Sequence, residues 1–413
     1  MPPQTAMQGD RVARPGRSNT YGGGGTYGGG GGPSGSPAAK GKKKSKRHKS
    51  PLWAKLLTTF GVILALVGVG GIVVVKYFLN QLTSNIQTTS SVLDSNGLGN
   101  KTVPVGKLPD GAMNLLMLGL DTRTGWGEGE SRSDTILILH ITASHDQAYM
   151  ISIPRDTVAK IPADESMGVR EQTTKINAAY LFGSQNGRGW QGGAKLATKA
   201  IHELTGIEFD GVMVIDFNGF KGILEAMGGV HLCVDKRMWS SHYVVNNGKV
   251  EYAHGKDPTS PPRNALWFEK GCRNMQPWEA LEFSRLRHST NGDYDRQRHQ
   301  QQLLRAMAKK ASSSGVMGNP TKVSKILAAA GKSLKMDTHG VPVDSFIFGL
   351  KGLAAGDLIP IKTNGGTFAP GQGGGEGISD DTRKLFEATS ADRLPEFLGR
   401  HPEMLINDAT AAS

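Results

Sequence analysis

Acidic and basic side chains recur where three apolar runs begin or end, between Asn114 and Asp156. The runs are Leu115–Leu120, Thr135–Ile141 and Ala148–Ile153. Their flanking charges are Asp121 and Arg123 after the first, Arg132 and Asp134 before the second, and Arg155 and Asp156 after the third. Runs of this length and β-branched content are typical of strands covered on both faces. An open α/β sheet presents its ligand groups at strand ends, so these side chains are predicted to form one site.

The residue types at this predicted site suit a phosphate ligand and a divalent cation. Arginines that converge on one place repel one another unless an anion is present, and guanidinium groups match phosphate oxygens bidentately. Asp121 and Asp134 would suit Mg²⁺, with Mn²⁺ as the alternative, because such ions take carboxylate, phosphate and water oxygens. These parts favour phosphoryl transfer, in which a carboxylate could accept the proton of an attacking hydroxyl.

Each of these charges also has a purely structural explanation. A single Asp–Arg pair at a strand end is more often a salt bridge or a turn cap than a ligand site. Asp156 could cap the turn that follows it, and Lys175 is as consistent with a solvated loop residue as with a ligand. His288 and His299 lack the spacing of a metal site and are expected to be ordinary polar residues. The sequence contains no P-loop and no GxSxG motif.

Further arginines follow in SRLRH and DRQRHQQ. Arg285 and Arg287 share one face if their segment is extended. From Asp295 a helix is predicted to about Ala311. Its inward stripe would be Arg296, His299, Gln300, Leu303 and Met307, and its solvated side Arg298, Gln302, Arg305 and Lys309. This helical phase selects Arg296 and Gln300 as ligand candidates in place of Arg298.

The start of the chain predicts a membrane anchor. Residues 1–52 form a basic, Gly- and Ser-rich tail that is expected to be disordered. Residues 1–55 contain eleven basic residues and one acid, a charge of +10 out of the net +12. Residues 53–78 are predicted to form a transmembrane helix, because Leu56 to Val75 carries no charge and is long enough to span a bilayer. The preceding lysines place the N-terminus in the cytoplasm and the remainder outside a cell membrane, where nucleic acid is not expected as a partner.

The remainder is expected to be one layered α-β-α domain with a central mixed β-sheet and helices on both faces. The expected boundaries are a stalk at 79–107, a catalytic domain at 108–312, a helical C-terminal extension with a glycine-rich loop at 313–400, and a flexible tail at 401–413. Within the extension, helices are predicted at 321–334, 343–352 and 379–399, a short strand ends at Pro360, and 363–378 is a flexible loop.

Two cysteines, Cys233 and Cys272, flank a long excursion at residues 235–271. Outside the membrane a disulfide between them is chemically permitted and is the favoured interpretation. Two separate buried thiols are the alternative.

The ordered motifs resemble those of one family, the LytR–CpsA–Psr proteins of Gram-positive bacterial envelopes, over about residues 112–312. The motifs are NLLMLGLDTR, SRSDTILIL, MISIPRDT, TKINAAY, GVMVIDFNGFKGILEAMGGV, GC, ALEFSRLRH and GDYDRQRHQQ. The resemblance implies a Mg²⁺-dependent phosphotransferase that moves a teichoic acid-like glycopolymer from a polyprenyl-pyrophosphate carrier to peptidoglycan. It also implies an apolar cavity for the lipid between sheet and helices.

Carried over by motif, Asp121 resembles a metal ligand, and Asp134 a metal ligand or general base. The residues that resemble pyrophosphate binders are Arg132, Arg155, Arg285, Arg287, Arg296 and Gln300, with Arg123 less certain in role. The chain has His299 where the family often has a second arginine. Two other functions stay open: a non-enzymatic envelope protein that binds lipid-linked pyrophosphate precursors, and a membrane-linked transcriptional attenuator, which would need a DNA-binding module that residues 1–50 do not supply.

Overall fold

The computed structural model describes residues 86–93, 110–122, 128–253, 260–289, 291–313, 319–341, 343 and 358–406. The chain divides into two compact units, Met1–Ala65 and Leu66–Ser413, and every described residue belongs to the second. The predicted tail, the predicted transmembrane helix and Arg123 lie outside the described residues. Among the helices that are described, none combines the length and the apolar character that a membrane span requires.

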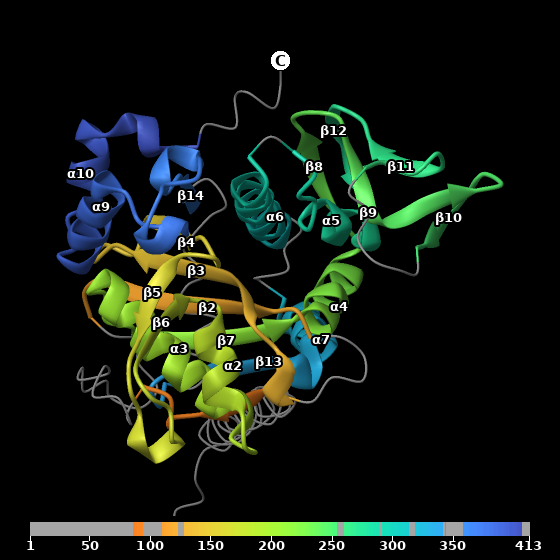
Figure 1. Ribbon diagram of the computed structural model, residues 1–413. Helices are drawn as coiled ribbons and strands as arrows, with labels where there is room; N and C mark the ends of the chain where they lie inside the picture. Colours follow the sequence, from red (N-terminus) through yellow and green to blue (C-terminus); the bar gives the residue numbers. More distant parts are fainter. Residues whose placement is uncertain are drawn as a thin grey trace, which may run out of the picture. The chain divides into compact units, whose positions relative to one another are not determined.

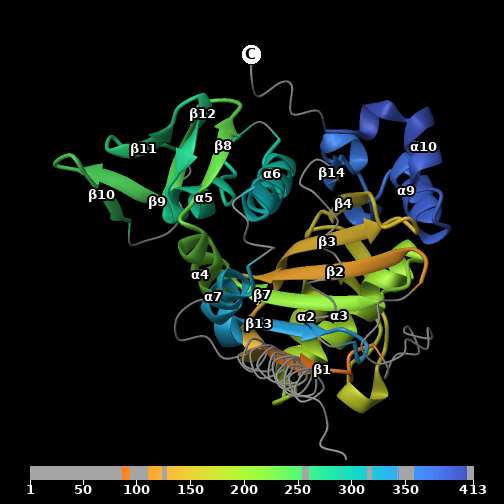
Figure 2. The ribbon, with the colours of Figure 1, turned by 180° about the vertical axis from the view of Figure 1, so that it is seen from behind.

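A seven-stranded mixed sheet forms the centre of the second unit (Figures 1 and 2). Its spatial order is β1 (Gln87–Thr89), β13 (Leu334–Asp337), β7 (Gly211–Asp216), β2 (Met113–Leu120), β3 (Ser133–Ile141), β4 (Ala148–Ile153) and β14 (Leu358–Ile361). β2, β3 and β4 are antiparallel neighbours, whereas β7 runs parallel to β2 and β14 parallel to β4. The predicted central mixed sheet is therefore confirmed, and the three apolar runs are its adjacent strands.

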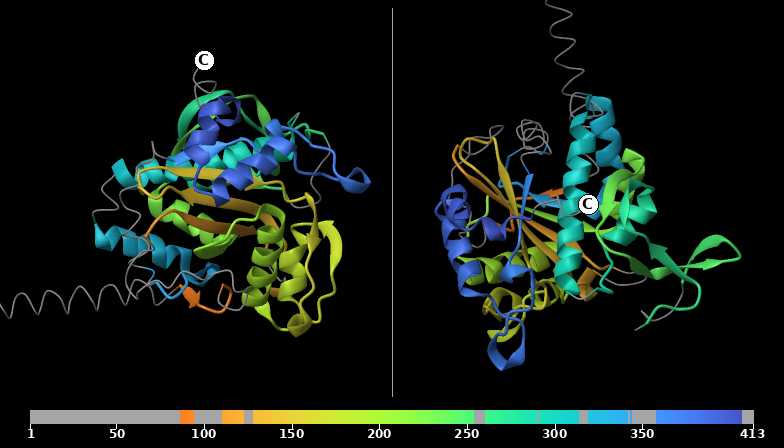
Figure 3. Two further views of the ribbon diagram at one scale, coloured as in Figure 1. Left: turned by 90° about the vertical axis from the view of Figure 1, so that its left-hand side faces the viewer. Right: turned by 90° about the horizontal axis from the view of Figure 1, so that it is seen from above.

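Helices cover both faces of this sheet, as the view from above in Figure 3 shows. One face packs on α2 (Ala178–Ser184), α3 (Gly189–Thr205), α9 (Asp380–Ser390) and α10 (Leu394–Arg400). The other face carries α4 (Phe217–Met227), α5 (Pro277–Phe283), α6 (Asp293–Ser313) and α7 (Pro320–Ala330). Alternation along β2 explains the two layers, because Leu116 and Leu118 belong to the first core and Leu115 to the second.

Strong capping signals fix α4, which separates the sheet from the peripheral strands. The side chain of Asp216 accepts a hydrogen bond from the Gly219 amide at 2.9 Å, and Gly228 ends the helix in the left-handed conformation. Gly229 then turns the chain where a Cβ atom would lie 2.2 Å from the carbonyl oxygen of Met275. The chain therefore leaves α4 directly into the next strand.

The described residues of the excursion at 235–271 include an antiparallel sheet, which its Pro and Gly content had not indicated. β9 (Met238–Asn246) pairs with β10 (Lys249–Tyr252) and β11 (Ala265–Phe268). At its base, β8 (Val230–Val234) pairs with β12 (Gly271–Met275), which places Cys233 opposite Cys272. The two cysteines form the predicted disulfide, with a sequence separation of 39. A further hairpin joins β5 (Val158–Ile161) to β6 (Gln172–Lys175).

Replacing both cysteines by serine is expected to lower the free energy of unfolding. Closure of a loop of this length contributes about 4 kcal/mol in the chain-entropy model. The thermal unfolding midpoint of the C233S/C272S protein should therefore lie below that of the wild type, and reductant should lower the wild-type midpoint alone. An unfolding midpoint that neither change moves would contradict a stabilising bond.

Several segments were assigned wrongly from the sequence, because they join the sheet or its helices in the folded chain. Part of the expected stalk is folded, because β1 pairs with β13 and the amides of Val92 and Leu93 donate to the Asp337 carboxylate. The predicted helix at 321–334 ends at Ala330, and Leu334 begins β13. The predicted helix at 379–399 is two helices, separated where Asp392 adopts a positive φ of 51°. Of the predicted helix at 343–352, only Val343 is described.

The remaining short elements are 3-10 turns. They are η2 (Glu128–Glu130), η3 (Glu165–Met167), η4 (Gly331–Ser333), η7 (Asn364–Gly366), η8 (Gln372–Gly374) and η9 (Pro402–Met404). The segment at 363–378, expected to be a flexible loop, contains two of these turns. It is held by backbone hydrogen bonds such as Gly371 N–H to Gly375 O at 2.7 Å.

Candidate active site

One edge of the central sheet gathers the ends of several strands. Leu120, the last residue of β2, pairs with Ser133 at the start of β3 and with Asp216 at the end of β7. Asp121 directly follows β2, and Asp134 directly follows Ser133. β4 runs antiparallel to β3, so its C-terminal end, and Arg155 two residues beyond it, belong to the same edge. The convergence expected from the sequence is therefore produced by sheet topology.

Three arginines contact Asp134. The Asp134 carboxylate accepts hydrogen bonds from the guanidinium groups of Arg155 at 2.6 Å and Arg287 at 3.4 Å. Arg296 donates to the backbone carbonyl oxygen of Asp134 at 2.9 Å. These arginines follow β4, follow α5 and lie in α6, respectively, so the cluster exists only in the folded chain.

A second carboxylate, Asp293, completes the cluster. Its Oδ1 lies 2.5 Å from Arg296 and 3.9 Å from the Nε atom of Arg155. Burial opposes the charge on Arg155, but Asp134, Asp156 and Asp293 outweigh it and raise the pKa of that guanidinium. Arg296 is only 3% exposed, and burial, reinforced by Arg287 and Arg155, lowers its pKa to about 10. An added negative charge would therefore stabilise the charged form of Arg296.

Some hydrogen-bond donors of this arginine cluster are not paired among the described residues. The Nε atoms of Arg155, Arg287 and Arg296 are buried, and within the described part of the chain none of them has a hydrogen-bond partner. Buried donors normally have acceptors, so these three Nε atoms are available to bind an anion. This is the chemistry of an anion-binding site.

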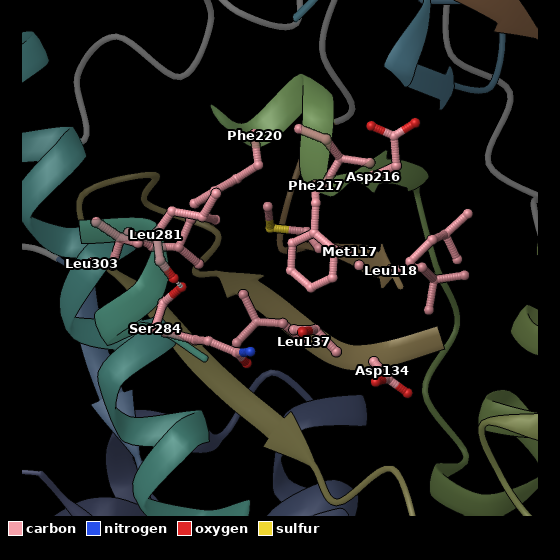
Figure 4. A pocket seen from close by; sticks show the side chains of 16 residues that line it. Met117, Leu118, Asp134, Leu137, Asp216, Phe217, Phe220, Leu281, Ser284 and Leu303 are labelled. Atoms are coloured by element: carbon pink, nitrogen blue, oxygen red, sulfur yellow. Dashed lines mark hydrogen bonds between the residues drawn. The ribbon is translucent and has the colours of Figure 1, made fainter. Parts of the chain in front are cut away.

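An apolar pocket opens beside the cluster, between the sheet and α4, α5 and α6 (Figure 4). It contains about 650 Å³ of space not filled by atoms, part of it open to solvent. In Figure 4, Asp134 and Asp216 lie toward one end, and Leu281 and Leu303 toward the other. Most of the lining is aliphatic or aromatic: Met117, Leu118, Leu120, Leu137, Ile215, Phe217, Phe220, Leu281, Leu303 and Leu304. The arrangement suits a ligand with an anionic group and a long apolar tail.

The other predicted site residues are dispersed around this centre. Arg285 lies with its guanidinium carbon 4.4 Å from the ring centroid of Phe217 and contacts His242. Arg132 is exposed and donates to the side chain of Asn177 at 3.4 Å. Gln300 lines the pocket, and its buried Oε1 has no hydrogen-bond partner among the described residues. The sequence-based set therefore combines residues of the anion cluster with residues of its surroundings.

Asp156 and Lys175, which the sequence left undecided, form an ion pair with each other at 3.1 Å. The Asp156 carboxylate also lies 4.0 Å from the Nε atom of Arg155. This pair therefore borders the anion cluster through Arg155.

Several contributing residues were missed from the sequence. Asp293 lay just before the expected helix start, and only a helix beginning two residues earlier would have placed it beside Arg296. Glu376 is buried and accepts a hydrogen bond from the Tyr294 hydroxyl, to which the Asn364 amide donates at 2.8 Å. Burial, with Asp293 and Asp156 nearby, raises the pKa of the Glu376 carboxyl. No local pattern connects residues 364–376 with a helix 70 positions earlier, so sequence reasoning had no signal for this contact.

The predicted phase of α6 was correct for Arg296 and Leu303 and for the exposed Lys309, but wrong for Arg298 and Gln302. Arg298 forms ion pairs with Asp235 at 2.7 Å and Asp295 at 3.1 Å. Gln302 donates to the carbonyl oxygen of Cys233 at 3.1 Å. The reason is that α6 packs against β8 as well as against the pocket, which leaves it with little solvated surface. His299, expected to be an ordinary polar residue, is completely buried against the ring of Phe283.

The burial of His299 predicts a pH dependence of stability. Burial lowers the pKa of this imidazole, although Asp235 at 3.4 Å opposes the shift. The unfolded chain therefore binds a proton near its usual pKa of about 6.5 while the folded chain resists it. Unfolding free energy should rise with pH between about 5 and 7, by at most about 1.4 kcal/mol per unit for this group. Denaturant titrations at several pH values should show this rise, and H299Q should flatten it. A wild-type midpoint higher at pH 5 than at pH 7 would contradict the assignment.

Comparisons with known proteins agree with the motifs. The model of the LytR_cpsA_psr family matches residues 77–352. The polyisoprenyl-teichoic acid–peptidoglycan teichoic acid transferase TagU of Oceanobacillus iheyensis is 29% identical over 299 residues, which are 72% of this chain and 79% of that protein. The cell wall biosynthesis protein LcpA of Corynebacterium glutamicum is 26% identical, over 65% of this chain and 54% of its own length.

A solved structure shares the fold. Protein gbs0355 of Streptococcus agalactiae superimposes with a TM-score of 0.51 at 19% identity, covering 68% of this chain and 88% of that one. At this identity the likeness shows the fold alone. The family model, in contrast, matches more than half of the chain and includes all the arginines that contact Asp134. The chain therefore belongs to the LytR_cpsA_psr family.

Proposed function

We propose that this protein transfers a glycopolymer from a polyprenyl-pyrophosphate carrier to peptidoglycan and forms a phosphodiester bond. The observation that carries the proposal is the apolar pocket with Asp134 and its three arginines beside it. A lipid-linked pyrophosphate has this combination of a long apolar tail and a concentrated negative charge. The names of the relatives, teichoic acid transferases and cell wall biosynthesis proteins, support the same reaction.

Asp121 and Asp134 would hold the Mg²⁺ ion that the family resemblance implies, and two carboxylates at one sheet edge fit the oxygen ligands that Mg²⁺ prefers. When bound, the ion would supply charge neutralisation at the pyrophosphate. The only three-residue cluster of metal-ligand type among the described residues is His231, Cys233 and Cys272. Its two sulfur atoms are joined in the disulfide, so it is not a competing candidate.

In the proposed mechanism the protein positions and neutralises the reacting groups. Arg155, Arg287 and Arg296 bind the pyrophosphate oxygens, and their Nε donors have no hydrogen-bond partner among the described residues. The pocket binds the first part of the polyprenyl chain. A sugar hydroxyl of peptidoglycan attacks the phosphorus atom that bears the glycopolymer, and polyprenyl phosphate leaves. Charge neutralisation of this kind carries most of the catalysis in phosphoryl transfer.

In the proposed topology, residues 53–78 anchor the protein in the cell membrane. The basic tail then lies in the cytoplasm and the catalytic domain outside. The uncharged run from Leu56 to Val75 and the preceding lysine cluster support this topology. An anchor of this kind keeps the site near a lipid substrate that remains in the bilayer.

The test is transfer by the purified full-length chain in detergent or lipid nanodiscs. Radiolabelled glycopolymer on a polyprenyl-pyrophosphate carrier is mixed with peptidoglycan, and label in the insoluble wall fraction is counted. The wild type should transfer label, and the D121A/R155A protein should not. Equal transfer by both proteins would favour the non-enzymatic alternative.

A further inference from the structure

A buried carboxylate holds a histidine that contacts Arg285. Glu282 in α5 is 1% exposed, and its carboxylate lies 3.0 Å from the Nδ1 atom of His242 in β9. The hydroxyl of Ser240 donates to the same carboxylate at 2.6 Å. Burial would raise the pKa of Glu282, but the contacts with His242 and Ser240 outweigh it and lower that pKa. Glu282 is therefore an ionised acceptor that fixes the orientation of the His242 ring.

The second ring nitrogen of His242 identifies its tautomer. Its Nε2 atom lies 3.3 Å from the guanidinium of Arg285, which can only donate hydrogen bonds. Nε2 must therefore carry the lone pair, and Nδ1 must carry the proton that Glu282 accepts. An imidazole with its Nδ1–H held by a buried carboxylate and its Nε2 atom as an acceptor has the arrangement of a general base.

Two contacts connect this histidine with the pocket, because its Nε2 atom lies 3.3 Å from Arg285. Arg285 packs on Phe217, and Phe217 lines the same pocket as Asp134. The imidazole of His242 is 26% exposed, so a substrate hydroxyl could reach it. The groups that face it are Glu282 and Ser240, Arg285, and the ring of Tyr252 in β10, stacked at 6.3 Å.

The carboxylate of Asp134 is poorly placed for the same task. It is already engaged by Arg155 at 2.6 Å and Arg287 at 3.4 Å, and proton uptake would weaken both ion pairs. Nε2 of His242 faces one guanidinium, that of Arg285 at 3.3 Å, and its protonation creates an imidazolium beside the ionised Glu282. The anionic substrate would at the same time draw Arg285 away from Nε2.

We propose that His242, oriented by Glu282, is the general base that deprotonates the acceptor hydroxyl. The inference rests on the proposed transfer reaction and adds a base to it. The hydroxyl proton passes to Nε2 as the oxygen forms its bond to the phosphorus that bears the glycopolymer. The bond from that phosphorus to the bridging oxygen breaks, and polyprenyl phosphate leaves with the electron pair. The imidazolium then returns its proton to solvent.

The experiment measures steady-state transfer by full-length protein in nanodiscs, with kcat and donor KM determined separately. H242A should lower kcat by about 10²–10⁴-fold, the usual contribution of a general base, and leave donor KM nearly unchanged. Added imidazole should restore part of the H242A rate, because a small base can enter the space left by the side chain. E282Q should also lower kcat, because its amide cannot stabilise an imidazolium. The loss should be smaller than in H242A, because the imidazole is still present. H242Q keeps most of the side-chain volume without the base and should lose kcat to the same extent as H242A. It replaces H242A in the comparison if H242A folds poorly.

The matched control is H231A, because His231 is an exposed histidine of β8 whose ring lies 3.1 Å from the side chain of Asn274, away from the pocket lining. It should transfer at the wild-type rate and gain nothing from imidazole. Wild-type kcat in H242A and H242Q would overturn the inference, as would a loss confined to donor KM that imidazole does not restore. Either result, with D121A/R155A still inactive, would leave the proposed transfer function standing. An inactive wild type would instead reject the transfer function itself.

Discussion

Replacing Arg155 by alanine is expected to lower the rate of glycopolymer transfer by about 10²–10³-fold, the range found when one charge-stabilising donor is removed from an active site. Arg155 makes the shortest contact with Asp134, at 2.6 Å, and its buried Nε is one of the donors without a described partner. A bound pyrophosphate would lose this guanidinium, and Arg287 and Arg296 would remain in place. The loss should therefore appear in kcat/KM with the fold retained.

The measurement compares transfer rates and unfolding midpoints of R155A and R383A. Arg383 in α9 has a side chain 59% exposed and makes only a local contact with Asp380 at 3.9 Å. Its replacement should change neither quantity by much, because exposed pairs of this kind contribute little to stability. If R155A and R383A transferred at the same rate, the anion cluster would not be the site of reaction.

Filling the apolar pocket is expected to lower glycopolymer transfer to a similar extent, because it excludes the lipid tail of the donor. Met117 of β2 lines the pocket, and tryptophan at this position would occupy space that the lipid tail needs. Exclusion of about four methylene groups would cost about 3 kcal/mol at about 0.8 kcal/mol each, equivalent to about 10²-fold in kcat/KM for a long-chain donor. The arginine cluster would be untouched.

Two controls separate pocket filling from general damage. M117L conserves volume closely and should remain near the wild type. A donor with a very short prenyl chain should be used equally well by M117W and the wild type, since it does not need the pocket. A uniform loss for both donors would mean that the substitution disturbs the sheet, and an unimpaired M117W with the long-chain donor would remove the pocket from the proposal.

Local sequence was sufficient for the strands at the centre of the fold. Three consecutive apolar runs predicted buried strands, and the charges at their ends then lay at strand termini. The disulfide could also be predicted from the sequence, because the chain contains only two cysteines. Some of the motifs that resemble the family lie on these same strands, and others lie on β7, α4, α5 and α6.

The arrangement of the arginines was beyond local reasoning. Arg155, Arg287 and Arg296 meet at Asp134, whereas Arg132 contacts Asn177 and Arg285 contacts His242. All five are alike as sequence features. They differ in the direction in which each segment leaves the sheet or α5, and that direction depends on strand order and on packing between elements far apart in the chain.

What the sequence by itself determined was therefore the chemistry available: carboxylates and arginines at strand ends, suited to a pyrophosphate. Only the tertiary structure decided which of them share one anion site, and it added Asp293, Glu376 and the His242–Glu282 pair. The physical reason is that periodicity along a strand or helix fixes which face a side chain occupies. Contacts between faces arise only when the sheet order and the two helical layers are assembled, and α6, packed on more than one side, had no single inward face to predict.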